Sequence, residues 1–385
     1  MSLEGQFDDD AGVVHVGHDA RQRYHDSRGY GYPLEGNEIA LAPVEAAHLL
    51  YRGDLDAVVE TSTGDRLDFQ AFVSREPGTD FGVRFLVYAD LRERGFYLSP
   101  AREPWIDESL LDAEHERIDF AVFPRGKGPG DGELEYALRV IGERTDIPAA
   151  ELADSVLAVV DEESEITYFD VNARNPSGET ETDLPTGVEA ALLEDRVVLW
   201  EPPIDLYEDA FYGQPLEGRE YERPTLQCSL LEAAYLAERG VIDLAVETVV
   251  ERGREVEGER FDRRLRVYTE LREREIVPKT GYKFGADFRT YANVESVSEL
   301  SHSELLVRVH PAGYIFEPRD LALDVRLAHG VRKTMVFALV GESDEDGEEA
   351  TGLTDDSDDS NDSNDTDASD DTTDIEWWSL ERLTP

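Results

Sequence analysis

The feature that most limits the possible folds of this chain is an internal repeat. Segments of the first half return in the second half in the same order, 180 to 187 residues later. The matching pairs are "PVEAAHLLYRGDLDAVVE" (43–60) with "LLEAAYLAERGVIDLAVE" (230–247), "VYADLRERG" (87–95) with "VYTELRERE" (267–275), "HERIDFAVFPRG" (115–126) with "HSELLVRVHPAG" (302–313), and "VLAVV" (156–160) with "VFALV" (336–340). We therefore interpret the chain as a tandem duplication of one folding unit.

Each repeat combines helical and strand-like segments. The helices at 43–52 and 230–239 are each followed by a glycine, Gly53 or Gly240, which suits the left-handed residue after a helix. The segment from Pro318 to Lys333 predicts a helix with proline in its first turn, and "MVFALV" (335–340) predicts a buried strand. The expected class is α+β, with each repeat divided into an N-terminal α/β subdomain and a C-terminal, nuclease-like mixed sheet flanked by helices.

The repeat also sets the expected boundaries. We expect the first repeat to consist of subdomains at 11–78 and 79–171, and the second of subdomains at 195–258 and 259–385. The intervening residues 172–194, rich in Pro, Gly, Asn and Thr, are the expected linker.

One segment lacks a counterpart in the first half. Residues 342–374 contain sixteen acidic residues and no basic residue, so they cannot bury enough apolar surface to fold. The following "IEWWSLERLTP" aligns with "ITYFDVNA" (166–173) and predicts a last strand. The acidic stretch is therefore expected to be a disordered loop inserted between two strands.

The charge of the chain indicates a salty environment. Among 385 residues, 87 are acidic and 37 basic, the formal net charge is -50, and only four residues are lysine. Such a surface is typical of halophilic proteins, because at 1 M salt the Debye length falls to about 3 Å and self-repulsion is screened. Without an apolar run of about 20 residues, a signal peptide or a second cysteine beside Cys228, we expect a cytoplasmic protein with no membrane contact, no disulfide and no cysteine-based zinc cluster.

The two halves differ in residues that can perform chemistry. Lys333 aligns with Ala153, while Tyr291, Lys279 and Lys283 have no equivalent in the first half. His302 aligns with His115. Residues needed only for folding should be alike in both halves, so we expect the active constellation in the second repeat.

A tyrosine, a histidine and a lysine together can cleave RNA without a metal. Histidine, with a pKa near 6.5, can donate a proton to the leaving 5′-oxygen. Tyrosine can accept the proton of the 2′-hydroxyl when a neighbouring cation favours its phenolate. Lysine supplies such a cation and balances charge in the transition state. This set requires neither a metal nor a cofactor.

"GYKFGADFRTY", "SHSELLV" and "DVRLAHGVRKTMVF" together resemble the archaeal tRNA-splicing endonucleases, also called tRNA-intron endonucleases, in their two-repeat homodimeric form. The resemblance implies that Tyr291 is the general base, His302 the general acid and Lys333 the residue that stabilises the transition state. It implies cleavage of precursor tRNA at both splice sites of a bulge-helix-bulge, giving 2′,3′-cyclic phosphate and 5′-hydroxyl ends.

The same resemblance implies further contacts. Arg326, seven residues before the lysine, would sandwich a bulge base with a second arginine from the last strand, which points to Arg382. Apart from the resemblance, Lys279 and Lys283 could contact phosphate or simply lie on the surface, and Lys283 is the preferred candidate for a phosphate contact. A homodimer of two active and two degenerate units is implied, with an acidic loop of the degenerate unit, here "DEESE" (161–165), docked on the partner chain.

Several alternatives stand beside this hypothesis. The chain could be a non-catalytic RNA-binding or assembly subunit, although such a subunit should have lost one member of the trio. A metal-dependent nuclease using some of the carboxylates would be inhibited by EDTA. His329 lies on the same predicted helical face as Arg326 and Lys333 and is a rival acid. His115, without a matching tyrosine or lysine, is expected to be a relic.

Overall fold

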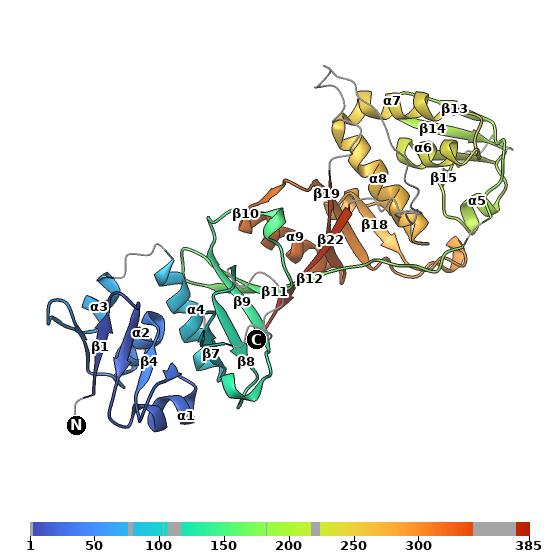
Figure 1. Ribbon diagram of the computed structural model, residues 1–385. Coiled ribbons are helices and arrows are strands. Elements are labelled where there is room, and N and C mark those ends of the chain that lie inside the picture. Colours follow the sequence, from blue (N-terminus) through green and yellow to red (C-terminus); the bar gives the residue numbers. More distant parts are fainter. Residues whose placement is uncertain are drawn as a thin grey trace, which may run out of the picture.

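The computed structural model describes residues 3–75, 80–102, 104–106, 117–181, 183–216, 224–341 and 375–385. In this part of the chain, a six-stranded sheet and a four-stranded sheet lie at opposite ends of the molecule, and a ten-stranded sheet lies between them (Figure 1). The mixture of sheets and covering helices confirms the predicted α+β class.

The N-terminal unit of the first repeat is a mixed sheet of six strands in the order β3-β4-β2-β1-β5-β6, covered by helices. It includes Glu4–Asp8, which precede the expected start at residue 11. Its strands are β1 (Glu4–Asp8), β2 (Val13–Val16), β3 (Tyr32–Pro33), β4 (Ile39–Leu41), β5 (Ala57–Glu60) and β6 (Arg66–Leu67). Its helices are α1 (Asp26–Arg28), α2 (Pro43–Arg52) and α3 (Phe69–Arg75), and α4 (Phe81–Glu93) leads into the central sheet.

The second repeat begins with an antiparallel sheet of order β13-β14-β16-β15. Its strands are β13 (Ala190–Leu192), β14 (Arg196–Trp200), β15 (Gln214–Pro215) and β16 (Thr225–Ser229), and its helices are α5 (Asp205–Glu208), α6 (Leu230–Glu238) and α7 (Val246–Glu257). Helix α8 (Glu259–Glu273) leads into the central sheet as α4 does in the first repeat.

The repeated helices α2 and α6 begin and end in the same way. A buried glutamate in the first turn, Glu45 or Glu232, accepts a hydrogen bond from the backbone N–H of the residue that caps the helix. This contact satisfies a donor that the helix itself leaves unpaired. Gly53 and Gly240 follow the two helices with φ of 72° and 67°, which confirms the predicted glycine ends.

The central sheet has the strand order β17-β18-β19-β21-β22-β12-β11-β9-β8-β7. Each repeat contributes five strands in mirrored order, and the two halves meet where β12 pairs antiparallel with β22. The strands are β7 (Tyr97–Pro100), β8 (Phe120–Phe123), β9 (Tyr136–Gly142), β11 (Ser155–Val160), β12 (Ile166–Ala173), β17 (Val277–Thr280), β18 (Phe288–Tyr291), β19 (Leu305–Pro311), β21 (Thr334–Val340) and β22 (Ile375–Leu383).

One hydrophobic cluster joins the two repeats across this sheet. It combines Phe169 of β12 and Leu157 of β11 with Leu380 of β22 and Phe337 of β21, under helix α9 (Pro318–Gly330). The short strands β10 (Ile147–Pro148) and β20 (Ile315–Phe316), one from each repeat, also pair with each other. The two copies therefore share one hydrophobic cluster and one sheet.

The sheet order corrects one part of the sequence alignment. The strand formed by "HERIDFAVFPRG", β8, pairs antiparallel with both β7 and β9, whereas β19 of "HSELLVRVHPAG" pairs in parallel with β21. In the first repeat the parallel partner of β11 is β9. The counterpart of β19 is therefore β9, and β8 corresponds to β18. His115 itself lies outside the described residues.

The expected linker is folded onto the second repeat. The backbone N–H of Gly178 donates to Arg274 O at 2.9 Å, and that of Glu179 donates to Ala292 O at 2.7 Å. The buried Thr180 donates its N–H to Glu275 O at 3.0 Å, and its Oγ1 accepts from Val294 N at 3.0 Å. A Cβ added at Gly178 would lie 2.3 Å from Glu275 O, so only glycine fits this approach.

The remaining expectations concern the last strand, the acidic insertion and membrane-spanning helices. The strand predicted from "IEWWSLERLTP" is confirmed as β22, paired with β12, while the acidic insertion 342–374 lies outside the described residues. Within the described residues, every helix is too short or too polar to traverse a bilayer.

Candidate functional site

Three neighbouring strands bring Tyr291, His302 and Lys333 to one end of the central sheet. Tyr291 is the last residue of β18, His302 lies three residues before β19, and Lys333 immediately precedes β21. Strands β18 and β19 are antiparallel, and β19 and β21 are parallel. The end of β18 therefore lies beside the beginning of β19, which in turn lies beside the beginning of β21.

Hydrogen bonds fix the segment that carries His302 between the other two residues. Lys333 Nζ donates to the backbone carbonyl of Ser303, the residue next to His302. The N–H of Glu304 donates to Thr290 O at 3.1 Å, and Glu304 O accepts from Thr334 N at 3.2 Å. The histidine segment is thus joined to the residues adjacent to both Tyr291 and Lys333.

The three side chains have different environments. Tyr291 is only 5% exposed, and its ring meets that of Phe211 edge to face with the centroids 5.7 Å apart. His302 is exposed, and its side chain has no hydrogen-bond partner among the described residues. Such an imidazole is accessible to a large ligand, whereas the phenol is held in place by packing.

Lys333 is half-buried, and its amine is less basic than usual. Burial lowers the pKa of Lys333, the nearby Arg289 guanidinium lowers it further, and the Glu304 carboxylate opposes this shift. The Lys333 ammonium also lies 5.9 Å from the ring centroid of Phe284. Of these neighbours, Arg289 was missed by the sequence analysis.

The end of helix α9 sets the position of Lys333. The helix stops at Gly330, so Lys333 does not continue the helical face that carries Arg326, as the sequence had allowed. Arg332 adopts a left-handed φ of 58°. Arg332 N donates to His329 O, and Lys333 N donates to Ala328 O, both at 3.0 Å, which is the paired pattern of a Schellman ending. This turn directs the chain from the helix into β21.

The predicted RNA-binding residues are all exposed. Arg326 lies on α9, together with the rival acid His329, and Lys283 lies in a 3₁₀ turn between β17 and β18. Arg382 lies on β22, where Leu380 is the partner of Met335. Continuing that register by two residues sets Arg382 opposite Lys333, so the acidic insertion has not moved it away from the trio.

The strand registers identify the equivalent positions in the first repeat. Tyr291 faces the first residue of edge strand β17, and Phe123 faces the first residue of edge strand β7. Arg289 corresponds in the same way to Ala121, and Lys333 corresponds to Ala153. The first repeat thus has apolar side chains where the second has a phenol, a guanidinium and an ammonium.

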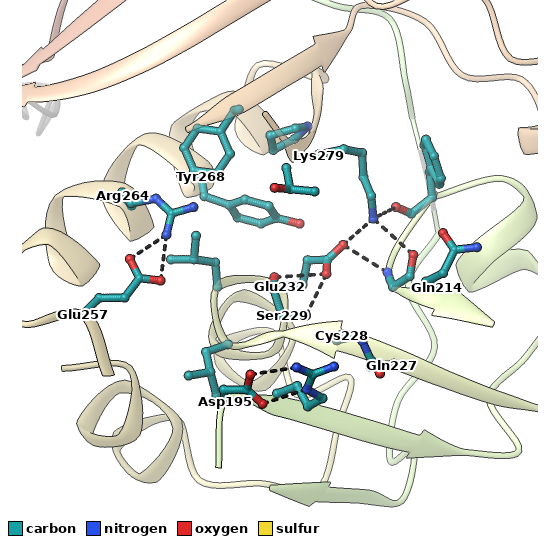
Figure 2. A pocket seen from close by; sticks show the side chains of 18 of the residues that line it. Asp195, Gln214, Gln227, Cys228, Ser229, Glu232, Glu257, Arg264, Tyr268 and Lys279 are labelled. Atoms are coloured by element: carbon teal, nitrogen blue, oxygen red, sulfur yellow. Dashed lines mark hydrogen bonds and ion pairs between the residues drawn. The ribbon is translucent and has the colours of Figure 1, made fainter. Parts of the chain in front are cut away.

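Lys279 has a structural role. Its Nζ is 2.6 Å from Glu232 Oε1 and also donates to the carbonyls of Phe211 and Gly213 at 3.1 and 3.2 Å. Figure 2 shows the Lys279 side chain directed toward Glu232, beside the capping contact of Ser229. Lys279 and Glu232 are both largely buried, and their ion pair joins the four-stranded unit to the edge of the central sheet.

The first repeat shows the effect of lacking this lysine. The position of Lys279 is taken by Ser99, and burial raises the pKa of Glu45, the equivalent of Glu232, to about 7. Burial would raise the pKa of Glu232 as well, but Lys279 and the backbone N–H groups of Ser229 and Gly213 hold it below its usual range. Lys279 therefore keeps a buried carboxylate ionised.

Comparison with known sequences agrees with this arrangement. A sequence profile described as "tRNA intron endonuclease, catalytic C-terminal domain" matches residues 261–349, which include Tyr291, His302 and Lys333. A second profile, "tRNA intron endonuclease, N-terminal domain", matches residues 3–73 and 188–255. The chain therefore belongs to the tRNA intron endonuclease family, a class of RNA-cutting enzymes.

Individual relatives extend the match over nearly the whole chain. The tRNA-splicing endonuclease of Halobacterium salinarum is 56% identical over 337 residues, which cover 86% of this chain and 94% of the relative. Those of Haloarcula marismortui and Haloferax volcanii are 52% and 49% identical, and each match covers the full length of this chain. These relatives are halophilic archaeal proteins, in agreement with the acidic composition.

We predict that Lys279→Met leaves Glu232 as an unpaired buried carboxylate and lowers the free energy of unfolding by about 3–5 kcal/mol at pH 8. In the variant, the folded-state pKa of Glu232 will lie above the unfolded value of about 4.3. The folded state then binds more protons than the unfolded state, so stability falls as pH rises from about 4.3 toward about 7, the pKa of Glu45. In the unaltered chain the pKa is depressed, and the contribution of Glu232 persists above about 4.3.

Denaturant unfolding in concentrated KCl at pH 5 and pH 8 will measure this difference. Lys127→Met is the matched control, because Lys127 pairs with Glu133 on the surface with both side chains more than 40% exposed, and its loss should cost less than about 1 kcal/mol. Equal destabilisation by Lys279→Met at the two pH values would contradict the assigned role.

Proposed function

We propose that this chain excises introns from precursor tRNA by cutting both splice sites of a bulge-helix-bulge, in a metal-independent transesterification. The observation that carries the proposal is the convergence of Tyr291, His302 and Lys333 at the ends of β18, β19 and β21. The equivalent positions of two of them hold Phe123 and Ala153 in the first repeat. Both copies have the same fold, but only the second copy has the phenol and the ammonium. This difference supports a single catalytic centre per chain.

The chemistry assigns one step to each residue. Tyr291 takes the proton of the 2′-hydroxyl, and the 2′-oxygen forms a bond to the adjacent phosphorus. The bond from phosphorus to the 5′-oxygen breaks, and His302 gives its proton to that oxygen. Lys333 offsets the charge that accumulates on the phosphate oxygens in the transition state. The products are a 2′,3′-cyclic phosphate and a 5′-hydroxyl, and water is not consumed.

The environments of the trio suit these steps. A general base must be held in one orientation, and Tyr291 is fixed by packing against Phe211. A residue that protonates a leaving group must reach the substrate, and His302 is exposed. The pKa of Lys333, lowered first by burial, reflects a partly dry position in which its charge acts strongly on a phosphate.

Base recognition is assigned to Arg326 and Arg382. Both guanidinium groups are exposed, and a flipped bulge base could stack between them. Lys283 is a further phosphate contact. A chain with a net charge of -50 repels RNA at low salt, so binding in concentrated salt must depend on short-range stacking and on RNA shape rather than on counterion release.

The alternative function, a non-catalytic RNA-binding or assembly subunit on the same scaffold, is disfavoured by the complete trio. We also propose the cytoplasm as the site of action, in keeping with the single cysteine and acidic composition.

For activity, we predict cleavage of a bulge-helix-bulge RNA in concentrated KCl with EDTA present. Tyr291→Phe, which copies Phe123, and His302→Ala should each slow the single-turnover rate by about 10²–10⁴-fold, the usual contribution of a general acid or base. His329→Ala is the control for the rival acid and should cut normally. Inhibition by EDTA would instead favour a metal-dependent nuclease, and intact RNA with the unaltered chain would contradict the proposed function.

For RNA binding, we predict that Arg326→Ala and Arg382→Ala each weaken the affinity for a non-cleavable bulge-helix-bulge RNA by about 1–3 kcal/mol, the value of one stacking contact. Arg319→Ala, another exposed arginine on α9, is the matched control and should bind normally. Fluorescence anisotropy in concentrated KCl will measure the dissociation constants. If the substitutions weaken binding only to a control RNA helix that lacks the bulges, base stacking is contradicted.

We further propose that two chains form the active particle, because two cuts in one substrate suit two sites at a fixed separation. The loop 161–165 between β11 and β12 is the candidate acidic docking element, and it folds on itself through Asp161 Oδ1, which accepts from the N–H groups of Glu163 and Glu165. Light scattering in concentrated KCl should give about twice the 43.2 kDa of one chain. A stable monomer that cuts both splice sites would refute the dimer.

A further inference from the structure

Among the described residues, Arg289 has no anionic partner. It is half-buried on β18, its Nε is buried, and among the described residues this Nε has no hydrogen-bond partner and the guanidinium forms no ion pair. Two other arginines of the same subdomain, Arg260 and Arg264, both contact the carboxylate of Asp287. Arg289 differs from these two arginines in having no carboxylate partner in the part of the chain that the structure describes.

The position of Arg289 connects it to the trio. It precedes Tyr291 by two residues on the same strand, so the two side chains share a face of the sheet, and its Cζ lies 5.8 Å from the centroid of the Tyr291 ring. It also contributes to the lowered pKa of Lys333, after burial. Across the sheet, Arg289 pairs with Leu306, and Leu306 pairs with Met335, two residues after Lys333. The guanidinium is therefore on the same face of the sheet as the phenol and the ammonium.

Two like charges held close together destabilise the fold unless an anion joins them. Lys333 donates to a backbone carbonyl, and Glu304, the neighbouring carboxylate, is exposed. Lys279, the cross-strand neighbour of Arg289, is already paired with Glu232. The pair Arg289 and Lys333 thus has unused capacity for an anion.

The first repeat provides an internal control. Ala121 occupies the position of Arg289, next to Phe123 and on the same sheet as Ala153. The guanidinium is therefore absent from the repeat that also lacks the phenol and the ammonium. Arg272 behaves differently, because it stacks on Tyr212 at 3.8 Å just as Arg92 stacks on Tyr30 at 3.8 Å in the first repeat. This stacked arginine, which has a structural role, is present in both copies.

We propose that Arg289 binds a non-bridging oxygen of the scissile phosphodiester and forms, with Lys333, a two-cation site for this group. The inference rests on the proposed function and adds a fourth residue to the site. A guanidinium presents N–H donors in a planar fork that matches phosphate oxygens. As the 2′-oxygen attacks, charge grows on these oxygens, so the contact should strengthen in the transition state.

Single-turnover cleavage of a bulge-helix-bulge RNA by Arg289→Met will test the contact. The rate should fall about 100-fold or more, as when one preorganised donor to a reacting oxygen is removed, and Arg289→Lys should recover part of it. Arg263→Met, which removes an arginine of α8 paired with Glu259 on the surface, is the matched control and should cut normally. Unfolding curves of the three variants will show whether Arg289→Met folds.

A sulfur substitution at the scissile phosphate separates direct contact from a structural effect. One of the two phosphorothioate diastereomers should slow the unaltered chain, and this penalty should vanish in Arg289→Met. The same penalty in both proteins would overturn the proposal. It would also be overturned if Arg289→Met were a monomer while the unaltered chain is a dimer, because the guanidinium would then pair with a carboxylate of the partner chain. If the unaltered chain cuts and Arg289→Met cuts equally fast, the Arg289 contact alone fails; if the unaltered chain does not cut, the proposed function fails with it.

Discussion

The pairing of β12 with β22 is the contact on which the rest of the molecule depends. Each repeat supplies five strands, and without the other repeat its last strand would be an open edge with unsatisfied backbone donors and acceptors. Six residue pairs between Tyr168↔Leu383 and Ala173↔Trp378 close both edges at once. The cluster around Leu380 and Phe169 then buries side chains of both copies. The first repeat, which has Phe123 and Ala153 in place of Tyr291 and Lys333, is therefore needed as half of the sheet that holds the second repeat in shape.

The positions of two lysines help to explain why this chain keeps any lysine at all. Lys279 neutralises a buried carboxylate at the junction of two units, and Lys333 is fixed by a helix ending beside the other members of the trio. Neither position is on the solvated surface, where salt screens charge and acidic residues predominate. Arginine performs the structural stacking in both copies, at Arg92 and Arg272. Two of the four lysines thus place a compact cation against an oxygen of the folded chain, whereas Lys127 and Lys283 lie on the surface.

Much of the fold could be predicted because the duplication repeats local patterns. The glycine ends of α2 and α6, the buried strand β21 and the last strand β22 each follow from residues that a reader can align. The alignment of 115–126 with 302–313 failed because two alternating apolar strands look alike, while their neighbours in the sheet are set by long-range pairing. Arg289 was missed for the same reason: among many arginines, only the register relates it to Ala121. The roles of Tyr291, His302 and Lys333 come from family resemblance, and the strand ends explain how they could cooperate.

The close contact of Gly178 with Glu275 has a consequence for where the chain could be divided into two products. The connection between the copies is packed against the second copy, because the backbone N–H groups of Gly178, Glu179 and Thr180 donate hydrogen bonds to carbonyl groups of that copy. A gene divided into two cistrons could therefore be cut before this stretch, around residue 174, with the stretch retained as a leader of the downstream product. A cut after Thr180 would strip that product of its own border. A division upstream of Gly178 therefore keeps every one of these backbone contacts within one product.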